Sequence, residues 1–203
     1  MLEPSCNQTL KDFCRIIVEV HGAEYLNRRP TDAEKQQYLH IMKFRGFPGC
    51  FDSWDCRHYL WKNCPQRLAS QLKDKRGKRI IMEVICDHLY VWYFNWVEPG
   101  SLNDLNILNR SSIVSNILAN TFSLKVNRWT INGVTRDWLY FLVDGMYPKS
   151  STFIKSGDDE KMSKHQEHVR KEIERFYRVL VQKLEILKCP LLGWYLDGVW
   201  KIV

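Results

Sequence analysis

The chain has 203 residues, 45% of them hydrophobic and 26% charged, which suits one domain with a core and excludes a disordered protein. Lys and Arg (30) outnumber Asp and Glu (23), so the net charge of +7 favours a polyanionic partner, nucleic acid before membrane. The longest apolar stretch, residues 89–97, is far shorter than the about 18 residues that cross a membrane, and the first residues lack a signal-peptide pattern, which argues against secretion.

Two helices are predicted ahead of Gly46. Apolar residues near helical spacing predict the first helix over residues 9–28. Thr31, with Glu34 three residues later, forms a capping box that begins the second helix, which ends near Gly46. Both are interpreted as packing helices without chemistry.

The first strand is predicted after the Gly46–Gly49 turn, with an acid near its end. Its apolar residues are Cys50, Phe51, Trp54 and Cys56. Asp55 is the expected acid of this strand, and Asp52 competes for the same role. Aromatic and basic residues are mixed over residues 57–65, a pattern typical of a core edge and also of a nucleic-acid platform.

Two apolar runs, residues 79–86 and 89–96, are separated only by Asp87 and His88 and predict a hairpin. Together with the first strand, this hairpin makes three adjacent strands. The basic residues 73–79 ahead of it predict a solvated loop, with phosphate contact as the alternative.

A further helix is predicted from Ser101 to Leu118. Asp104 lies in its first turn, where the helix dipole favours an acid. Asn132 and Gly133 then predict the turn of a second hairpin within residues 125–143.

The second arm of that hairpin leads to Asp144. Six apolar residues, 138–143, run straight into this acid before a turn at Gly145 to Pro148. A strand covered on both faces has such a continuous apolar run. A lone carboxylate at its end is costly unless a metal, a cation or hydrogen bonds satisfy it, although an acid that opens an ordinary turn explains the pattern as well.

An exposed loop is predicted over residues 150–163, and an amphipathic helix over residues 163–188. The apolar stripe of this helix consists of Val169, Ile173, Phe176, Leu180, Leu184 and Leu187. Glu174 lies on the rim of the stripe. It is either an ordinary boundary glutamate beside Arg170 and Arg175 or a further acid of a functional site.

Seven cysteines without C-x-x-C spacing favour reduced, mostly buried thiols and hence an intracellular compartment. A zinc site is the alternative. Its ligands would be Cys50, Cys56, His58 and Cys64, but their spacing fits no common zinc module.

The predicted elements have the order of an RNase H-like nuclease core: three antiparallel strands, a helix, a strand that ends in an acid, and a later helix with an acid. Carboxylates held in this way can bind two divalent metals about 4 Å apart, which cleave phosphodiester bonds. The predicted fold class is therefore α/β, with an RNase H-like mixed sheet flanked by helices in residues 46–203 and a helical segment at residues 1–45.

Several stretches form a specific combination: Arg45-Gly-Phe-Pro-Gly49, Ser53-Trp-Asp55-Cys-Arg-His58, Trp61-Lys-Asn-Cys-Pro65, Pro99-Gly-Ser-Leu-Asn-Asp104, Asp144-Gly-Met-Tyr-Pro148 and Val169-Arg-Lys-Glu-Ile-Glu174-Arg175. In this order they resemble the PIF/Harbinger superfamily of transposases, in particular its plant-type branch of DDE-superfamily endonucleases. The resemblance covers residues 9–203, nearly the whole chain.

This resemblance implies that Asp55, Asp144 and Glu174 are the catalytic acids and bind Mg²⁺ or Mn²⁺. Asp104 matches the acid of the family's Gly-Ser-x-x-Asp motif, as an auxiliary metal ligand, with a helix cap as the structural alternative. The residues implied to line the site or contact DNA are His58, Trp61, Lys62 and Arg175, of which the last is also a candidate partner of Glu174.

The resemblance implies a metal-dependent DNA endonuclease or strand transferase that acts at transposon ends in the nucleus, with the cytoplasm as a further location. A separate Myb-like or trihelix-like protein is the implied reader of those ends. Two other functions fit the same residues. One is a domesticated or degenerate copy that binds DNA or protein without cutting, and the other is an intracellular nuclease with no role in transposition.

The chain departs from the family pattern at several points. Asp52 stands where the plant-type branch usually has Gly, and Phe176-Tyr177-Arg178 stands where the branch shows an aromatic residue and then Gly. The family's N-terminal helix-turn-helix region has no counterpart and its C-terminal helix is cut at Val203, so a fragment or a repurposed copy is expected.

Overall fold

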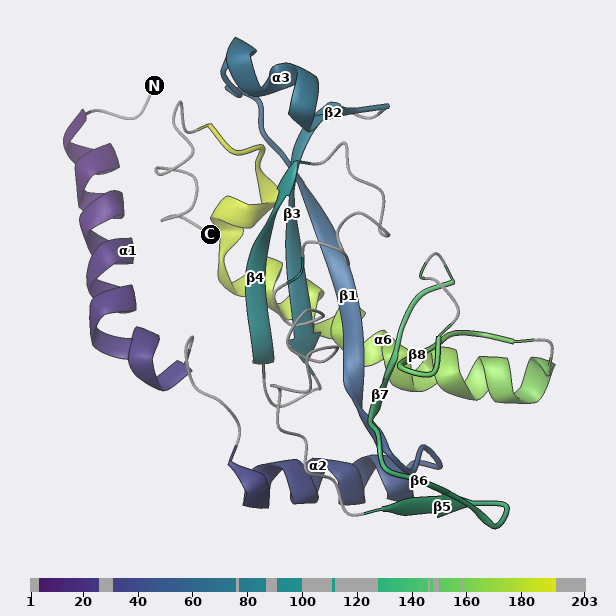
Figure 1. The fold of residues 1–203 in the computed structure, drawn as a ribbon. Helices are drawn as coiled ribbons and strands as arrows, with labels where there is room; N and C mark the ends of the chain where they lie inside the picture. Colours follow the sequence, from purple (N-terminus) through teal and green to yellow (C-terminus); the bar gives the residue numbers. More distant parts are fainter. Residues whose placement is uncertain are drawn as a thin grey trace.

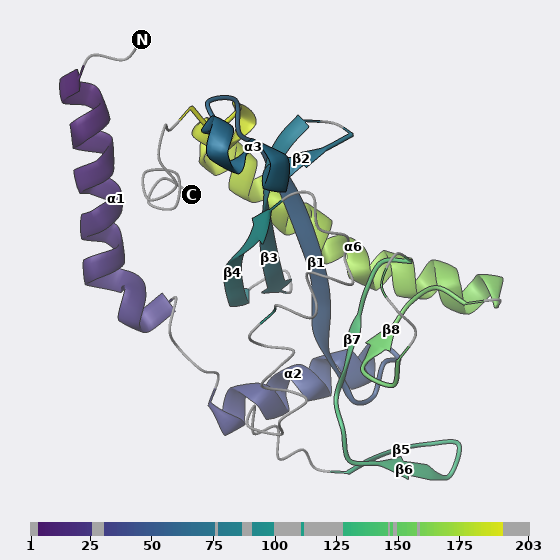
Figure 2. The same ribbon diagram turned by 45° about the horizontal axis from the view of Figure 1, so that its top comes forward.

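A mixed β-sheet forms the centre of the fold, and the long helix α6 crosses one of its faces (Figure 1 and Figure 2). The computed structural model describes residues 4–25, 31–75, 77–86, 91–99, 111, 128–145, 147, 150–157 and 159–192. In chain order the elements are α1 (Pro4–Tyr25), α2 (Asp32–Phe44), β1 (Cys50–Leu60), α3 (Gln66–Leu72), β2 (Lys73–Asp74), β3 (Gly77–Cys86), β4 (Val91–Pro99), β5 (Trp129–Ile131), β6 (Val134–Arg136), β7 (Tyr140–Leu142), β8 (Phe153–Ile154), α6 (Glu160–Lys183) and the 3-10 turn η1 (Glu185–Lys188). None of these helices is long and apolar enough to cross a membrane.

The strands of the main sheet follow the order β2-β3-β1-β7-β8, and β4 also pairs with β3. The pairs β1–β3 and β3–β4 are antiparallel, so the predicted hairpin and the three adjacent strands are confirmed. The pairs β1–β7 and β7–β8 are parallel. The predicted α/β class with a mixed sheet is therefore confirmed.

The strand β1 extends further than predicted. It has 11 residues, and Asp55 lies in its middle rather than near its end. The reason is the unbroken pairing with β3, which runs from Ser53 opposite Cys86 to Leu60 opposite Arg79. Cross-strand hydrogen bonds thus carry the strand into the aromatic and basic stretch that was expected to follow it.

Two predicted loops contain short strands that the sequence pattern did not reveal. In the basic stretch, β2 pairs with the start of β3, with Lys73 opposite Lys78. In the predicted loop over residues 150–163, β8 pairs in parallel with β7 and buries Phe153. A strand of two residues is too short to display an alternating pattern, so only the neighbouring strand defines it.

The second hairpin is confirmed at its turn and wrong at its second arm. Asn132 and Gly133 have positive φ angles of 49° and 76°, as a two-residue hairpin turn requires. However, β5 and β6 form a separate two-stranded sheet that ends at Arg136. The apolar run that leads to Asp144 is a different strand, β7, because its side chains are buried in the main sheet whereas those of β6 are exposed.

Side chains that alternate along the strands divide the core between the two faces of the main sheet. On β3, Met82 belongs to a cluster that includes Ile173 of α6. Ile85 points to the opposite face and packs with Trp54 and Phe141. The continuous apolar run of β3 therefore reflects burial on both faces, as expected for such a run.

Thr31 and Glu34 form the predicted capping box of α2. The backbone N–H of Thr31 donates to the Glu34 carboxylate at 2.8 Å, and the N–H of Glu34 donates to Thr31 Oγ1 at 3.3 Å. α2 then packs against the start of β1, where Met42 lies in a cluster with Phe47 and Cys50.

The first helix, α1, is confirmed as a helix but begins earlier than predicted and stands apart from the sheet in both ribbon views (Figure 1 and Figure 2). Its apolar residues Phe13 and Val20 are 60% and 64% exposed. The expected packing of this helix is therefore wrong within the described part of the chain, because these side chains face solvent and not the core.

The last helix is confirmed with shifted bounds. α6 begins after Asp159, whose carboxylate accepts from the N–H of Met162 at 2.7 Å, and the predicted final turn is the 3-10 segment η1. The helix predicted from Ser101 to Leu118 lies outside the described residues, and the division into residues 1–45 and 46–203 stays a prediction.

Gly49 and Gly133 provide a matched pair of substitutions that measures how tightly β5 packs on the sheet. Both have positive φ, but a Cβ at Gly49 would overlap the ring of Trp129, whereas a Cβ at Gly133 meets open space. We expect Gly133→Ala to lower the free energy of unfolding by about 1 kcal/mol and Gly49→Ala by about 2–4 kcal/mol. Urea unfolding of both variants measures the difference, and equal losses would contradict this packing.

Candidate active site

Strand register brings Asp55 and Asp144 to the same face of the sheet. In the parallel pair β1–β7, Ser53 lies opposite Leu142. Asp55 lies two residues after Ser53 on β1, and Asp144 lies two residues after Leu142, just beyond the end of β7. Residues at equal offsets on neighbouring strands point to the same face. Leu142 packs against Val169 of α6, so the shared face is the one that α6 covers.

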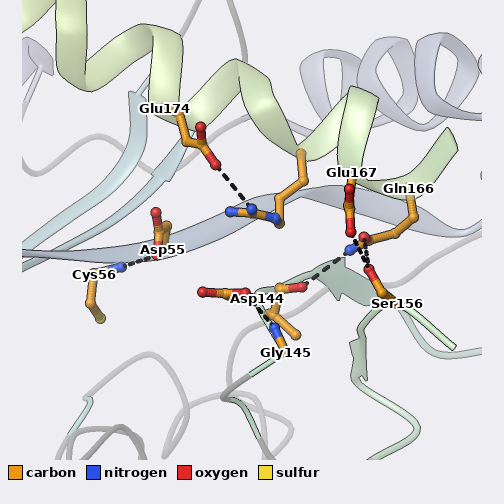
Figure 3. A network of polar contacts seen from close by, with 10 residues as sticks. Asp55, Cys56, Asp144, Gly145, Ser156, Gln166, Glu167 and Glu174 are labelled. Carbon is orange, nitrogen blue, oxygen red and sulfur yellow. Dashed lines mark hydrogen bonds and ion pairs between the residues drawn. The ribbon is translucent and has the colours of Figure 1, made fainter. Parts of the chain in front are cut away.

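Helix α6 brings Glu174 to these two acids. Its neighbours Ile173 and Tyr177 are buried against the sheet, and Glu174 is a rim residue whose side chain is 38% exposed, as its helical position predicted. In Figure 3 the carboxylates of Asp55, Asp144 and Glu174 point into one shared space between the helix and the strands. The structure therefore brings together the three acids that the sequence singled out.

Asp55 has an unusual electrostatic environment. Its pKa is raised from 3.8 to about 6, chiefly because burial disfavours the ionised form, and the charges of Asp144 and Glu174 raise it further. The N–H of Cys56, which donates to the Asp55 carboxylate at 2.8 Å, and the charge of Arg170 act in the opposite direction. Mutual repulsion of this kind requires the three acids to lie near one another.

Arg170, which the sequence placed only as a neighbour of Glu174, pairs with it in the structure. Its guanidinium donates to the Glu174 carboxylate at 2.9 Å across one turn of α6, and its side chain is 12% exposed. The signal in the sequence was the i, i+4 spacing of the two residues. Arg175, the partner that the resemblance suggested for Glu174, is exposed.

The end of β7, which carries Asp144, is held by a buried amide that sequence reasoning missed. Gln166 of α6 is 2% exposed, and its Nε2 donates to the carbonyls of Val143 at 3.1 Å and Ile154 at 3.3 Å. Its Oε1 accepts from Ser156 Oγ at 3.1 Å. Figure 3 shows this network beside Asp144, which remains exposed. Gln166 therefore fixes the backbone and leaves the carboxylate accessible.

Two further contacts hold α6 against the sheet around Glu174. The Tyr177 hydroxyl donates to the backbone carbonyls of Asp55, at 3.2 Å, and of Met82, at 3.4 Å. On the preceding turn, the Glu172 carboxylate pairs with both guanidinium nitrogens of Arg45 at the end of α2. These contacts position the helix, and so the third acid, relative to β1.

The remaining predicted site residues that the structure describes differ in burial and in the face of the sheet to which they belong. Trp61 is fully buried in the core, which agrees with the core-edge alternative for that stretch. His58 is exposed and, by alternation along β1, points to the face opposite Asp55. Lys62 is exposed beyond the end of β1, and Asp104 lies outside the described residues.

Within the part of the chain that the structure describes, no three His, Cys, Asp or Glu side chains are already gathered closely enough to hold a metal ion. The four residues of the zinc alternative, Cys50, Cys56, His58 and Cys64, are all described, and they do not form such a group. Of the seven free cysteines, three are buried, so the expected burial of most thiols is wrong. The guanidinium of Arg170 instead pairs with Glu174, and its charge also acts on Asp55.

A fourth acid, Glu83, is buried on the other face of the sheet. It is 0% exposed, and its carboxylate accepts from Trp54 Nε1 at 3.1 Å and from Ser111 Oγ at 2.9 Å. Burial raises its pKa to about 7. The sequence indicates the burial of Glu83, because this residue lies within the apolar run of residues 79–86. Because Glu83 faces away from Asp55, it is a core residue and not a member of the acid cluster.

A family model described as plant transposon protein matches residues 23–203 of the chain. Comparison with curated proteins and with solved structures found no match.

The raised pKa of Asp55 predicts a specific pH dependence of stability. The folded metal-free chain binds the Asp55 proton more tightly than the unfolded chain, so this stabilisation is complete below about pH 4 and lost as pH rises through about 6. We expect the stability of Asp55→Asn relative to wild type to increase by about 2–3 kcal/mol over this range. Urea unfolding in EDTA measures it, and a pH-independent difference would contradict the raised pKa.

Replacing Gln166 tests the attachment of the β7 end. Gln166→Met keeps the side-chain volume but removes the donor to the buried Val143 carbonyl and one of the two donors to the Ile154 carbonyl, so we expect a loss of about 1–3 kcal/mol in unfolding free energy. Hydrogen exchange at Asp144 and Gly145 should also become faster. The matched control is Gln182→Met on the exposed side of the same helix, where no such change is expected.

Proposed function

The chain belongs to the plant transposon protein family, and we propose that it is the catalytic domain of a PIF/Harbinger-type DDE transposase that cleaves DNA. The observation that carries this proposal is the meeting of Asp55, Asp144 and Glu174 on one face of the sheet. These three acids come from the middle of one strand, the end of its parallel neighbour and a helix, although 89 positions separate Asp55 from Asp144 and 30 separate Asp144 from Glu174.

The topology of the sheet supports an RNase H-like fold. In the order β4-β3-β1-β7-β8, the first three strands are the antiparallel strands expected of such a core, and β7, which leads to the second acid, pairs in parallel with β1. In this arrangement the first acid lies on the central strand β1 and the second follows β7. The third acid approaches from the helix that crosses the same face.

The chemistry of the donor set supports a hard divalent cation, Mg²⁺ or Mn²⁺. Asp55, Asp144 and Glu174 would hold it through carboxylate oxygens, the ligands that such ions prefer, and Asp104 is proposed as a further ligand. Bound ions of this kind supply activation of the attacking water and stabilisation of the leaving 3′ oxygen in phosphodiester cleavage. Two of the acids are within reach of solvent, since Asp144 is exposed and Glu174 half-exposed.

The chain's own residues would position and shield this chemistry. Pairing on both edges holds β1 and thereby Asp55, while Gln166 holds the backbone that carries Asp144. Tyr177 and the pair between Arg45 and Glu172 hold α6. Burial of Asp55 removes water from one side of the site, so a bound cation would interact more strongly with its carboxylate than in bulk solvent.

The proposed substrate is DNA. The net charge of +7 supports a polyanionic partner. Lys62 and Arg175 are exposed to solvent, with Arg175 on the same helix as Glu174. Recognition of transposon ends is proposed for a separate Myb-like or trihelix-like protein, and the nucleus is the proposed compartment.

A second candidate function is a copy that binds DNA or protein without cutting. It is favoured by the pairing of Glu174 with Arg170 and by the lack of a preassembled three-ligand group among the described residues. The two candidates share the DNA surface and differ only in whether the acids support cleavage.

Nicking of supercoiled plasmid DNA by the purified chain tests the proposal. We expect activity with Mg²⁺ or Mn²⁺ and none in EDTA. Asp144→Ala and Glu174→Gln should each lose at least about 100-fold, because each removes a carboxylate ligand. The matched control is Asp137→Asn, an exposed carboxylate outside the cluster, which should retain wild-type activity.

The result also separates the two candidates. Equal residual nicking by wild type and Asp144→Ala would reject cleavage by this chain. DNA binding in a gel-shift assay without metal-dependent nicking would favour the non-catalytic function.

A further inference from the structure

Arg170 places a positive charge among the acids of the candidate active site. Its Nη2 donates to Glu174 Oε1 at 2.9 Å, on the side of α6 that faces the sheet. Its charge also acts on Asp55, in the direction opposite to that of Asp144 and Glu174. Arg170 is therefore a counter-ion of Asp55 as well as of its helical neighbour Glu174.

The burial of Arg170 distinguishes it from the cations beside it. The Arg170 side chain is 12% exposed, whereas Lys171 and Arg175 on the same helix are exposed. A buried guanidinium that already donates to a carboxylate cannot reach the phosphates of a duplex without leaving that carboxylate uncompensated, which is costly in a partly buried setting. The contact thus belongs to the interior of the site and not to a DNA-binding surface.

The guanidinium and a divalent cation would compete for the Glu174 carboxylate. The Glu174 oxygen that accepts from Arg170 is no longer free to approach a cation shared with Asp55 and Asp144. Two positive charges at one site also repel each other, and a partly buried site screens this repulsion less than water does. The lack of a three-ligand group among the described residues agrees with a cluster already neutralised by the protein's own cation.

We propose that Arg170 is a latch of the acid cluster: in the metal-free chain it holds Glu174 and compensates the negative charge, and a divalent cation must displace it to be bound. The inference rests on the proposed function, because it assigns regulation to the same metal site. The latch keeps the three acids folded together in the absence of metal and lowers the affinity of the site for its cation.

Isothermal titration of the full chain with Mn²⁺ tests the latch by a readout that does not depend on cleavage. We expect Arg170→Gln to bind Mn²⁺ about tenfold more tightly than wild type, which corresponds to about 1.4 kcal/mol. The matched control is Lys171→Gln, which removes the same charge from the adjacent exposed position and should change the affinity less than about twofold. Arg170→Lys keeps a charge at the site and should stay close to wild type.

A second measurement addresses folding. Without its counter-ion the metal-free cluster should be less stable, so Arg170→Gln should unfold at a lower temperature in EDTA and show a larger rise of the unfolding midpoint with Mn²⁺. Arg170→Met, which keeps most of the aliphatic stem, repeats both measurements if the Gln variant does not fold.

The outcomes separate the latch from the proposed function. If wild type binds Mn²⁺, Asp144→Ala does not, and Arg170→Gln binds no more tightly than wild type, the latch is rejected while the metal site stands. Binding by Arg170→Gln alone would support the latch in its strongest form. If neither wild type nor any Arg170 variant binds Mn²⁺, the metal site itself is rejected, and the latch with it.

Discussion

The parallel pairing of β7 with β1 is the constraint on which the candidate site depends. Because Ser53 lies opposite Leu142, the acids two residues further on face the same side of the sheet. A shift of this register by one residue would turn Asp144 to the opposite face. Such a shift is opposed by the buried side chains of β7, which pack on both faces, and by Gln166, whose amide binds the backbone of Val143. Core packing thus determines where the carboxylate lies.

The same arrangement creates an electrostatic conflict that the fold must compensate. Three carboxylates that face one another repel, and burial of Asp55 adds a desolvation cost that raises its pKa to about 6. The compensation comes from the N–H of Cys56, which donates to the Asp55 carboxylate, and from Arg170 of helix α6 beside Glu174. Helix α6, which positions Glu174, therefore also positions the cation that offsets part of the repulsion in the absence of metal.

Sequence reasoning succeeded where a local pattern carries the information and failed where a neighbouring strand decides. The Thr31 capping box and the Asn132–Gly133 turn follow from residues within a few positions of each other, and both are confirmed. The end of β1 and the two-residue strand β8 depend on pairing with distant segments, which no local pattern contains. The second hairpin was wrong for this reason, since the partner of β7 is β1 and not the adjacent β6.

The sequence by itself determined the α/β class, the strand or helix on which Asp55, Asp144 and Glu174 lie, and the family relationship that accompanies them. Only the tertiary structure decided that the three acids share one face, that Gln166 holds the strand end and that the charge of Arg170 acts on Asp55 as well as on Glu174. The physical reason is that periodicity along one chain reports which side of an element is buried. Which residues meet across elements depends on strand register and helix docking, and these arise from packing of the whole core.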